Sequence, residues 1–301
     1  MSANASTKVI IAALIGNAAI SITKFFAAFT TGSSAMLSEG IHSLVDTGNQ
    51  ILLLYGMKQA KKPADEEFPF GHGKEIYFWS FVVAILIFAV GSGVSIYEGI
   101  HHVRHPAVIE NPMVNYIVLS LALVFEGGAW FFAFKEFGKI KGQRGYIEAV
   151  KRGKDPSMFV VLFEDSAAML GLLIALLGIW LTQVTGIAVF DGIASIMIGL
   201  ILGGTAIWLA VETKGLLIGE GANRSVIASI RKITESFDEV EKVNELLTMH
   251  MGPEFILVNI SIRFSSGKLT REIETVIQEI DSAIKAEHEM VKRVFVEAES
   301  A

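Results

Sequence analysis

Six long apolar stretches in the first 211 residues constrain the fold of this chain more than any other feature. We place them near residues 8–30, 33–57, 76–100, 113–135, 158–182 and 188–211. Each is long enough to cross the hydrocarbon core of a bilayer as one helix, which takes about 20 residues. Because a segment in lipid must satisfy its own backbone hydrogen bonds, we expect an all-α transmembrane domain of six helices.

The composition agrees with a membrane protein. Of the 301 residues, 52% are hydrophobic and only 19% are charged, and the mean hydropathy is +0.52. The net charge of −6 offers no basic surface for nucleic acid, so we do not expect nucleic-acid binding. The chain has no cysteine, so any metal must be held by imidazole and carboxylate groups.

Basic residues in the loops predict the orientation. The loop after the second stretch contains Lys58, Lys61, Lys62 and Lys74, and the loop after the fourth contains Lys135, Lys139, Lys141, Arg144, Lys151, Arg152 and Lys154. The positive-inside rule places both loops, and hence both termini, in the cytoplasm. We read stretch 8–30 as a permanent helix without an Arg-rich transit segment, so a bacterial inner membrane is the expected location.

From about residue 223 the apolar pattern becomes shorter and periodic. It predicts a helix over 225–237, strands over 243–251 and 255–264, a helix over 269–286 and a strand over 291–299. We therefore divide the chain into a transport domain, 1–212, and a small cytosolic α/β domain, 213–301, with a ferredoxin-like αββαβ order. A three-stranded sheet leaves open edges, which favours pairing with a second copy.

Ionisable residues inside the apolar stretches are the candidates for function. His42 and Asp46 are four residues apart, so they share one helix face. A charged group at that depth costs roughly 2.5–3.5 kcal/mol unless it is compensated, and a metal ion would compensate it. Asp165 on another helix supplies a third donor, and the fourth is open between Glu164, Glu39 and water.

A structural interpretation competes with this one. The acids could form interhelical ion pairs or hydrogen bonds, with Lys24 neutralising one of them. Glu126 and Glu98, taken singly, fit structural roles at least as well as functional ones, and Asn17 fits packing. Of the seven histidines, only His42 falls inside a predicted span.

Four segments carry a family likeness. NAAISITKFFAAFTTGSSAMLSEGIHSLVD, FPFGHGKE, EDSAAMLGLLIA and FDGIASIMIG resemble the cation diffusion facilitator family of zinc and manganese transporters. The resemblance implies six spans, cytoplasmic termini, a homodimer in the lipid bilayer, and exchange of a divalent cation for protons. Zinc is the implied cargo and manganese the alternative.

The resemblance also assigns residues. It implies that His42, Asp46 and Asp165 bind the transported ion and that Asp191 has a capping or packing role. It implies that Lys74 holds two protomers together by pairing with Glu212 or Glu220. Where the family usually has a histidine, this chain has Val161, with Glu164 beside Asp165. That variant resembles the branch containing the mitochondrial zinc transporter nine, and its oxygen-rich donor set admits manganese.

Secondary metal sites of the family are depleted here. Asp65 and His72 remain in the second loop, but Phe68 stands where another histidine would be, and His72 could simply hydrogen-bond the turn. In the tail, Asn244 and Asn259 replace histidines, leaving only the acids Glu297 and Glu299. We expect His250 and His288 to be exposed and the tail to dimerise without a binuclear zinc centre.

The sequence therefore predicts a metal-ion/proton antiporter that exports its cargo from the cytoplasm by alternating access. One alternative is a membrane-embedded metal-dependent enzyme with His42, Asp46 and Glu164 around a catalytic ion. Another is a metal sensor or scaffold that acts through its tail. No HExxH motif, nucleophile motif or GxxxxGK loop is present, so we expect neither an enzyme nor an ATP-driven pump.

Overall fold

The structure is a computed structural model that describes residues 3–141, 145–146, 149 and 156–299. It divides into two compact units. The first holds the residues up to Gly56, then Trp79–Ala149 and Pro156–Thr213; the second holds Met57–Phe78 and the chain from Lys214 onward. The loop between α2 and α3 therefore groups with the C-terminal domain, and we describe each unit by itself.

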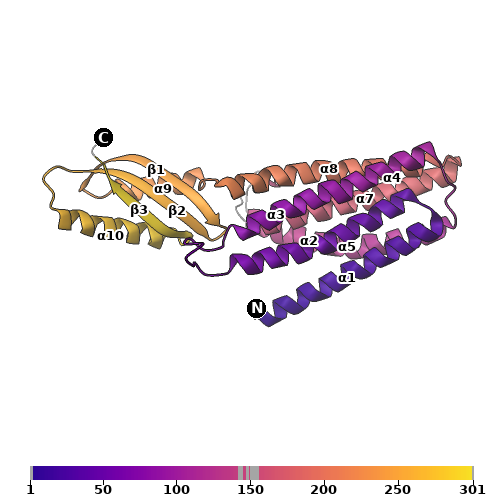
Figure 1. Ribbon diagram of the computed structural model, residues 1–301, viewed down its shortest axis with the longest axis horizontal. Coiled ribbons are helices and arrows are strands. Elements are labelled where there is room, and N and C mark those ends of the chain that lie inside the picture. Colours follow the sequence, from indigo (N-terminus) through magenta and orange to yellow (C-terminus); the bar gives the residue numbers. More distant parts are fainter. Residues whose placement is uncertain (1–2, 142–144, 147–148, 150–155, 300–301) are drawn as a thin grey trace. The chain divides into compact units, whose positions relative to one another are not determined.

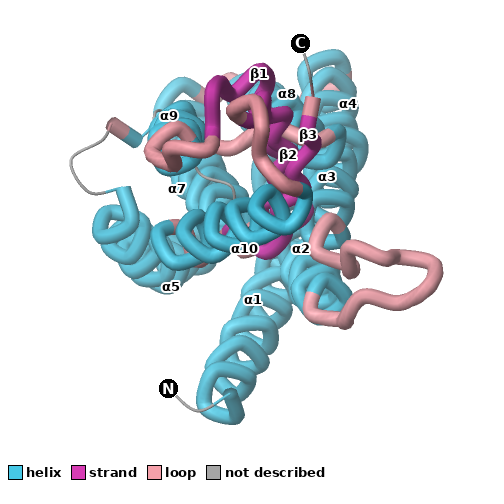
Figure 2. Tube along the Cα trace, turned by 90° about the vertical axis from the view of Figure 1, so that its left-hand side faces the viewer, coloured by secondary structure: helices cyan, strands magenta, loops and turns pink. Residues whose placement is uncertain are grey.

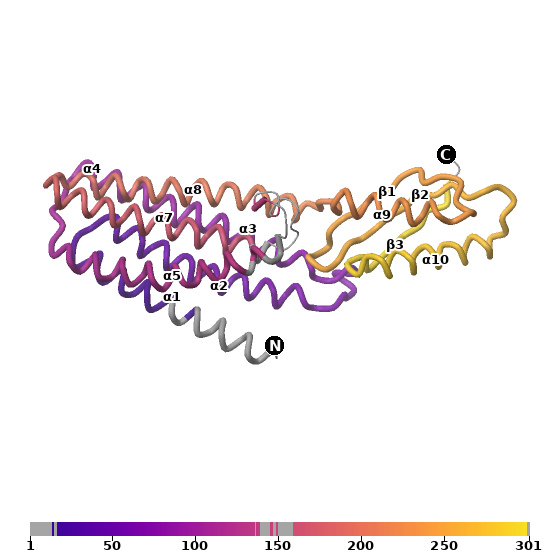
Figure 3. The backbone as a smooth tube through the Cα atoms, turned by 180° about the vertical axis from the view of Figure 1, so that it is seen from behind, coloured from indigo at the N-terminus to yellow at the C-terminus, as the bar shows by residue number. Residues whose placement is uncertain are grey.

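Long helices make up the first unit (Figures 1 and 3). They are α1 (Ala3–Thr31), α2 (Ser34–Ala60), α3 (Glu75–Leu86), η1 (Ile87–Ser92), α4 (Gly93–Arg104), α5 (Pro112–Lys141), α7 (Pro156–Thr185) and α8 (Val189–Ile218). Among the described residues, four helical segments are long and apolar enough to cross a membrane: Glu75–Arg104, Pro112–Lys135, Phe159–Thr185 and Val189–Ile218. The protein is therefore a membrane protein with these four apolar helices.

The first two helices stay predictions as membrane spans. α1 has 29 residues and α2 has 27, so both have sufficient length. α2, however, carries Glu39, Asp46 and Lys58, which lower its hydropathy. In α1 the side chains of residues 3–13 lie outside the described set.

The third span is longer and less regular than its sequence predicts. A π-helical turn, Ile87–Ser92, joins α3 to α4, and α4 continues to Arg104 because the first helix-breaking residue is Pro106. His101 and His102 thus lie on a candidate span, and the prediction that His42 alone does so is wrong. His102 is buried, with its Nε2 3.7 Å from Asp191 Oδ2.

Asp191 ties the start of α8 to the start of α2. Its carboxylate accepts hydrogen bonds from Ser33 Oγ at 2.6 Å, from the Ser34 amide at 2.5 Å and from Ser34 Oγ at 3.0 Å. A buried carboxylate at a helix N-terminus satisfies amides that the helix itself leaves free. Asp191, which belongs to α8, therefore caps the N-terminus of α2.

The C-terminal part of the second unit has the predicted element order (Figure 2). It runs α9 (Arg224–Thr234), β1 (Val240–Gly252), β2 (Phe255–Phe264), α10 (Thr270–Glu287) and β3 (Val291–Ala298). In the sheet β1 pairs antiparallel with β2, and β2 pairs parallel with β3 across the α10 connection. Apolar residues of both helices, such as Ile230 and Ile280, pack with Val258 and Ile260 of β2 to form its core.

Two histidines of this unit correct the sequence analysis. His250 is 1% exposed, so its predicted exposure is wrong. The segment after α8 runs along β1, where the His250 amide donates to Glu220 O at 3.0 Å and the Ala222 amide donates to Thr248 Oγ1 at 2.9 Å. His288 is partly buried, and its Nε2 lies 2.9 Å from Ser229 Oγ.

Candidate metal site

A polar stripe on α2 forms one wall of the candidate site. Glu39, His42 and Asn49 are at most 1% exposed, and Asp46 is partly buried on the same side. Residues three and four apart share a helix face, which explains the stripe. The helices packed around α2 exclude water from it, so each polar atom there needs a partner within the protein or a bound ion.

An acidic cavity of about 410 Å³ lies between α1, α2, α5 and α7. Asp46, Glu164 and Asp165 all line it, as does Glu126 of α5. Asn17, Ser43, Gln50 and Val161 also border it. The structure thus brings together the three predicted carboxylates from α2 and α7. It adds Glu126, for which the sequence fitted a structural role at least as well as a functional one. It also places Asn17, for which we expected a packing role, at the cavity.

One carboxyl group of this cavity has a defined partner. Asn49 Nδ2 donates to Glu164 Oε1 at 2.6 Å. Asp46 Oδ1 is buried and makes no hydrogen bond. Carboxylates that share a buried cavity repel one another unless a cation or a proton is bound among them. The chemistry of the cavity therefore suits either a cation or protons.

His42 lies next to these acids but does not line the cavity. Its Nδ1 is 3.3 Å from Asp46 Oδ1, yet neither ring nitrogen makes a hydrogen bond. Burying an imidazole without hydrogen-bond partners costs free energy. A ring nitrogen of neutral His42 is therefore free to bind a cation.

Glu39 is drawn away from the site. Lys24 Nζ donates to its Oε2 at 3.0 Å, and its Oε1 packs against Gly171 so tightly that a Cβ there would overlap it. Glu39 is absent from the cavity lining. The expectation that Glu39 supplies a fourth donor is therefore not supported. Lys24 does neutralise an acid, as the structural interpretation predicted.

The candidate donors share a cavity without forming a closed cage. Within the described part of the chain, no three His, Asp or Glu side chains converge closely enough to hold an ion as they stand. Inward movement of α2 and α7 side chains would be needed to surround a cation.

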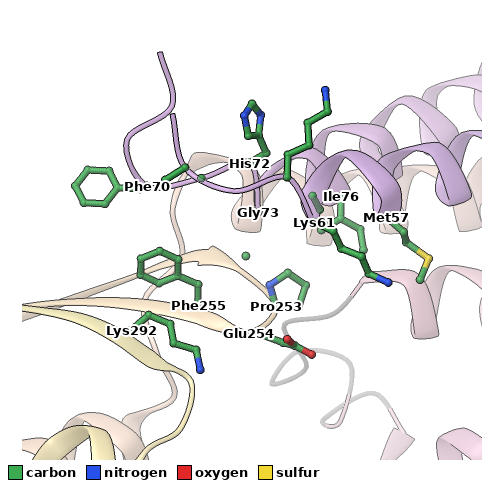
Figure 4. Close-up of a pocket in the computed structure, with 15 residues that line it drawn as sticks. Met57, Lys61, Phe70, His72, Gly73, Ile76, Pro253, Glu254, Phe255 and Lys292 are labelled. Atoms are coloured by element: carbon green, nitrogen blue, oxygen red, sulfur yellow. The ribbon is translucent and has the colours of Figure 1, made fainter. Parts of the chain in front are cut away.

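The second loop contains a smaller polar cluster. His72 Nε2 donates to Asp65 Oδ2 at 3.0 Å, while Asp65 Oδ1 accepts the Phe68 amide at 2.7 Å. These hydrogen bonds, the one from His72 first, hold the pKa of the Asp65 carboxyl below its ordinary value. His72 also borders a cavity of about 500 Å³ together with Lys61, Phe255 and Lys292 (Figure 4). The structure thus joins Asp65 and His72 as a hydrogen-bonded turn.

Other predicted residues have varied outcomes. Lys74 Nζ contacts Met249 Sδ at 3.7 Å within its own chain, and its pairing across a dimer stays a prediction. In the tail, Asn244 Nδ2 donates to Glu299 O at 3.5 Å. Within the basic loop, the side chains of Lys139, Lys141, Arg144, Lys151, Arg152 and Lys154 lie outside the described residues.

These features define a class: a helical membrane protein with a buried carboxylate cavity. A family model described as the cation efflux transmembrane domain matches residues 10–218. The chain belongs to this cation efflux, or cation diffusion facilitator, family.

Individual relatives agree with the family. The chain is 32% identical over 288 residues to a protein of Xenopus laevis named proton-coupled zinc antiporter SLC30A9, mitochondrial, covering 93% of this chain and 52% of that protein. It is 29% identical to metal tolerance protein C4 of Arabidopsis thaliana, covering 82% and 55%. It is 22% identical to manganese efflux system protein MneP of Bacillus subtilis, covering 97% and 95%.

The likeness to the branch of zinc transporter nine is thereby confirmed. The chain spans about half the length of the antiporter relatives it matches. The three relatives reported carry names of metal antiport, tolerance or efflux and none of an enzyme, so the prediction that this chain is not an enzyme is confirmed. The mitochondrial relatives do not support the expected bacterial inner membrane, which stays a prediction.

Proposed function

We propose that this protein exchanges a divalent metal ion, zinc first and manganese second, for protons across a membrane. The observation that carries the proposal is the cavity shared by Asp46, Glu164 and Asp165 inside a cation efflux domain. Carboxylate and imidazole groups are ligands that zinc and manganese both accept. The names of the antiporter and efflux relatives support the same reading.

Metal and proton would compete for the same groups. Any proton on Asp46, Glu164 or Asp165 must leave before these carboxylates can bind a cation. His42, beside Asp46, must be neutral to donate a nitrogen. A cation entering the cavity therefore releases protons, and protons returning from the other side release the cation. Alternating access by rearranging helices would separate the two events.

The remaining features of the proposal follow from the sequence. The basic loops favour cytoplasmic termini by the positive-inside rule, and export from the cytoplasm is the direction that we propose. The open edges of the three-stranded sheet, and Lys74 in its loop, support a homodimer. The metal-sensor and scaffold alternatives gain no supporting observation from the described residues.

Metal uptake into proteoliposomes tests this function. With the vesicle interior more acidic than the outside, full-chain protein should accumulate zinc, and a protonophore that collapses the gradient should remove the accumulation. Empty liposomes with the same gradient are the control. Zinc entry at an equal rate with and without the pH gradient would contradict proton exchange.

A further inference from the structure

Lys24 of α1 is a fully buried cation beside the acidic cavity. It is 0% exposed, and its ammonium group makes three contacts, to Glu39 Oε2 at 3.0 Å, to Glu126 Oε1 at 2.8 Å and to Ser43 Oγ at 2.8 Å. Because an ammonium group has three donors, this set satisfies it completely. Lys24 therefore fixes one acid of α2 and one acid of α5.

The two acids that pair with Lys24 differ in the environment of their second carboxylate oxygen. The second oxygen of Glu39 packs against Gly171, and Glu39 does not reach the cavity. Glu126 lines the cavity together with Asp46, Glu164 and Asp165. Its Oε1 is bound to Lys24, whereas its Oε2 is buried and makes no hydrogen bond. One oxygen of Glu126 is thus anchored, and the other is available.

We propose that Glu126 is a cargo ligand contributed by α5, and that Lys24 is the positioning residue that holds it at the cavity. The inference rests on the proposed transport function and names a donor beyond the α2 and α7 residues. Its geometry is a carboxylate with one oxygen on a fixed cation and the other buried without a hydrogen-bond partner. Such support of a ligand by a neighbouring group orients it and tunes its affinity.

The identity of the nearby residues explains why α5 would be recruited. Val161 of α7 also borders the cavity and offers no donor. A carboxylate oxygen from Glu126 can complete a donor set of one imidazole and several carboxylates. Oxygen donors favour manganese relative to zinc more than nitrogen donors do. Glu126 should therefore matter more for manganese than for zinc.

Equilibrium binding to the purified full chain tests the inference. We expect Glu126→Gln to weaken manganese binding about tenfold, with a smaller loss for zinc, because an outer-shell or ligand change typically costs 10–100-fold in affinity. Glu39→Gln is the matched control, since Glu39 also binds Lys24 but does not line the cavity. It should leave both affinities at the value of the parent protein. Thermal unfolding of each variant in detergent checks that both fold.

The outcomes separate this inference from the proposed function. Parent protein that binds metal but shows no gradient-driven transport would overturn the function while leaving the ligand assignment open to this titration. Equal manganese affinities for the parent and a folded Glu126→Gln variant would overturn the role of Glu126. Equal losses for Glu126→Gln and Glu39→Gln would show that the loss comes from disturbing the ion pairs of Lys24, and would overturn the assignment of Glu126 as a ligand.

Discussion

Replacing Asp46 or Asp165 by asparagine is expected to lower metal transport by about 100-fold or more, the upper range of what a single metal-site residue contributes. Asn has the shape of Asp but no charge, so the cavity would lose one of the groups that compensate a divalent cation in a low-dielectric site. The measurement is the initial rate of zinc uptake into proteoliposomes under a fixed pH gradient.

Glu110→Gln is the control for this experiment. It makes the same kind of change at an exposed carboxylate in the loop between α4 and α5, and it should transport at the parent rate. If folded Asp46→Asn and Asp165→Asn variants both transport zinc as fast as Glu110→Gln, the cavity is not the transport site.

Replacing Lys24 by methionine should strongly destabilise the first unit. It would leave Glu39 and Glu126 without their shared cation in a buried environment, and breaking a buried ion pair by removing one partner costs about 3–5 kcal/mol. Methionine retains most of the volume of lysine, so the loss reflects charge rather than a cavity. Thermal unfolding of the detergent-solubilised protein measures it.

A suppressor variant distinguishes charge from packing. Adding Glu39→Gln and Glu126→Gln to Lys24→Met removes the orphaned acids and should recover a large part of the lost stability. Glu110→Gln added to Lys24→Met should recover none of it. If Lys24→Met unfolds at the parent temperature, the buried triad contributes nothing to stability, and the account of how Glu126 is held is wrong.

Sequence periodicity predicted those helices and strands whose apolar pattern can be recognised within the segment itself. Long apolar runs gave the four segments that qualify as spans, and the tail order from Arg224 to Ala298 was correct. His42, Asp46, Glu164 and Asp165 could be chosen because charges are rare in such runs, and three of the four line one cavity.

Features that depend on contacts between distant segments were not predictable in the same way. Asp191 accepts a hydrogen bond from the Ser34 amide, 157 positions earlier in the chain. Lys24 pairs with Glu126, 102 positions later. No local pattern reveals such pairs. His250 also pairs with a segment distant in the sequence, since its amide donates to Glu220 O. The π-helical turn at Ile87–Ser92 lies in an apolar run whose composition fits an α-helix equally well.

Proton release on zinc binding tests the central claim most directly. Calorimetric titration of the purified full chain in buffers of different ionisation enthalpy gives the number of protons released per zinc bound. Because Asp46, Glu164 and Asp165 share one buried cavity, we expect a proton among them before the cation arrives, and the parent should release about one proton or more per zinc. Asp46→Asn should release fewer. Zinc binding without proton release, or release unchanged in Asp46→Asn, would contradict exchange of metal and protons at this cavity.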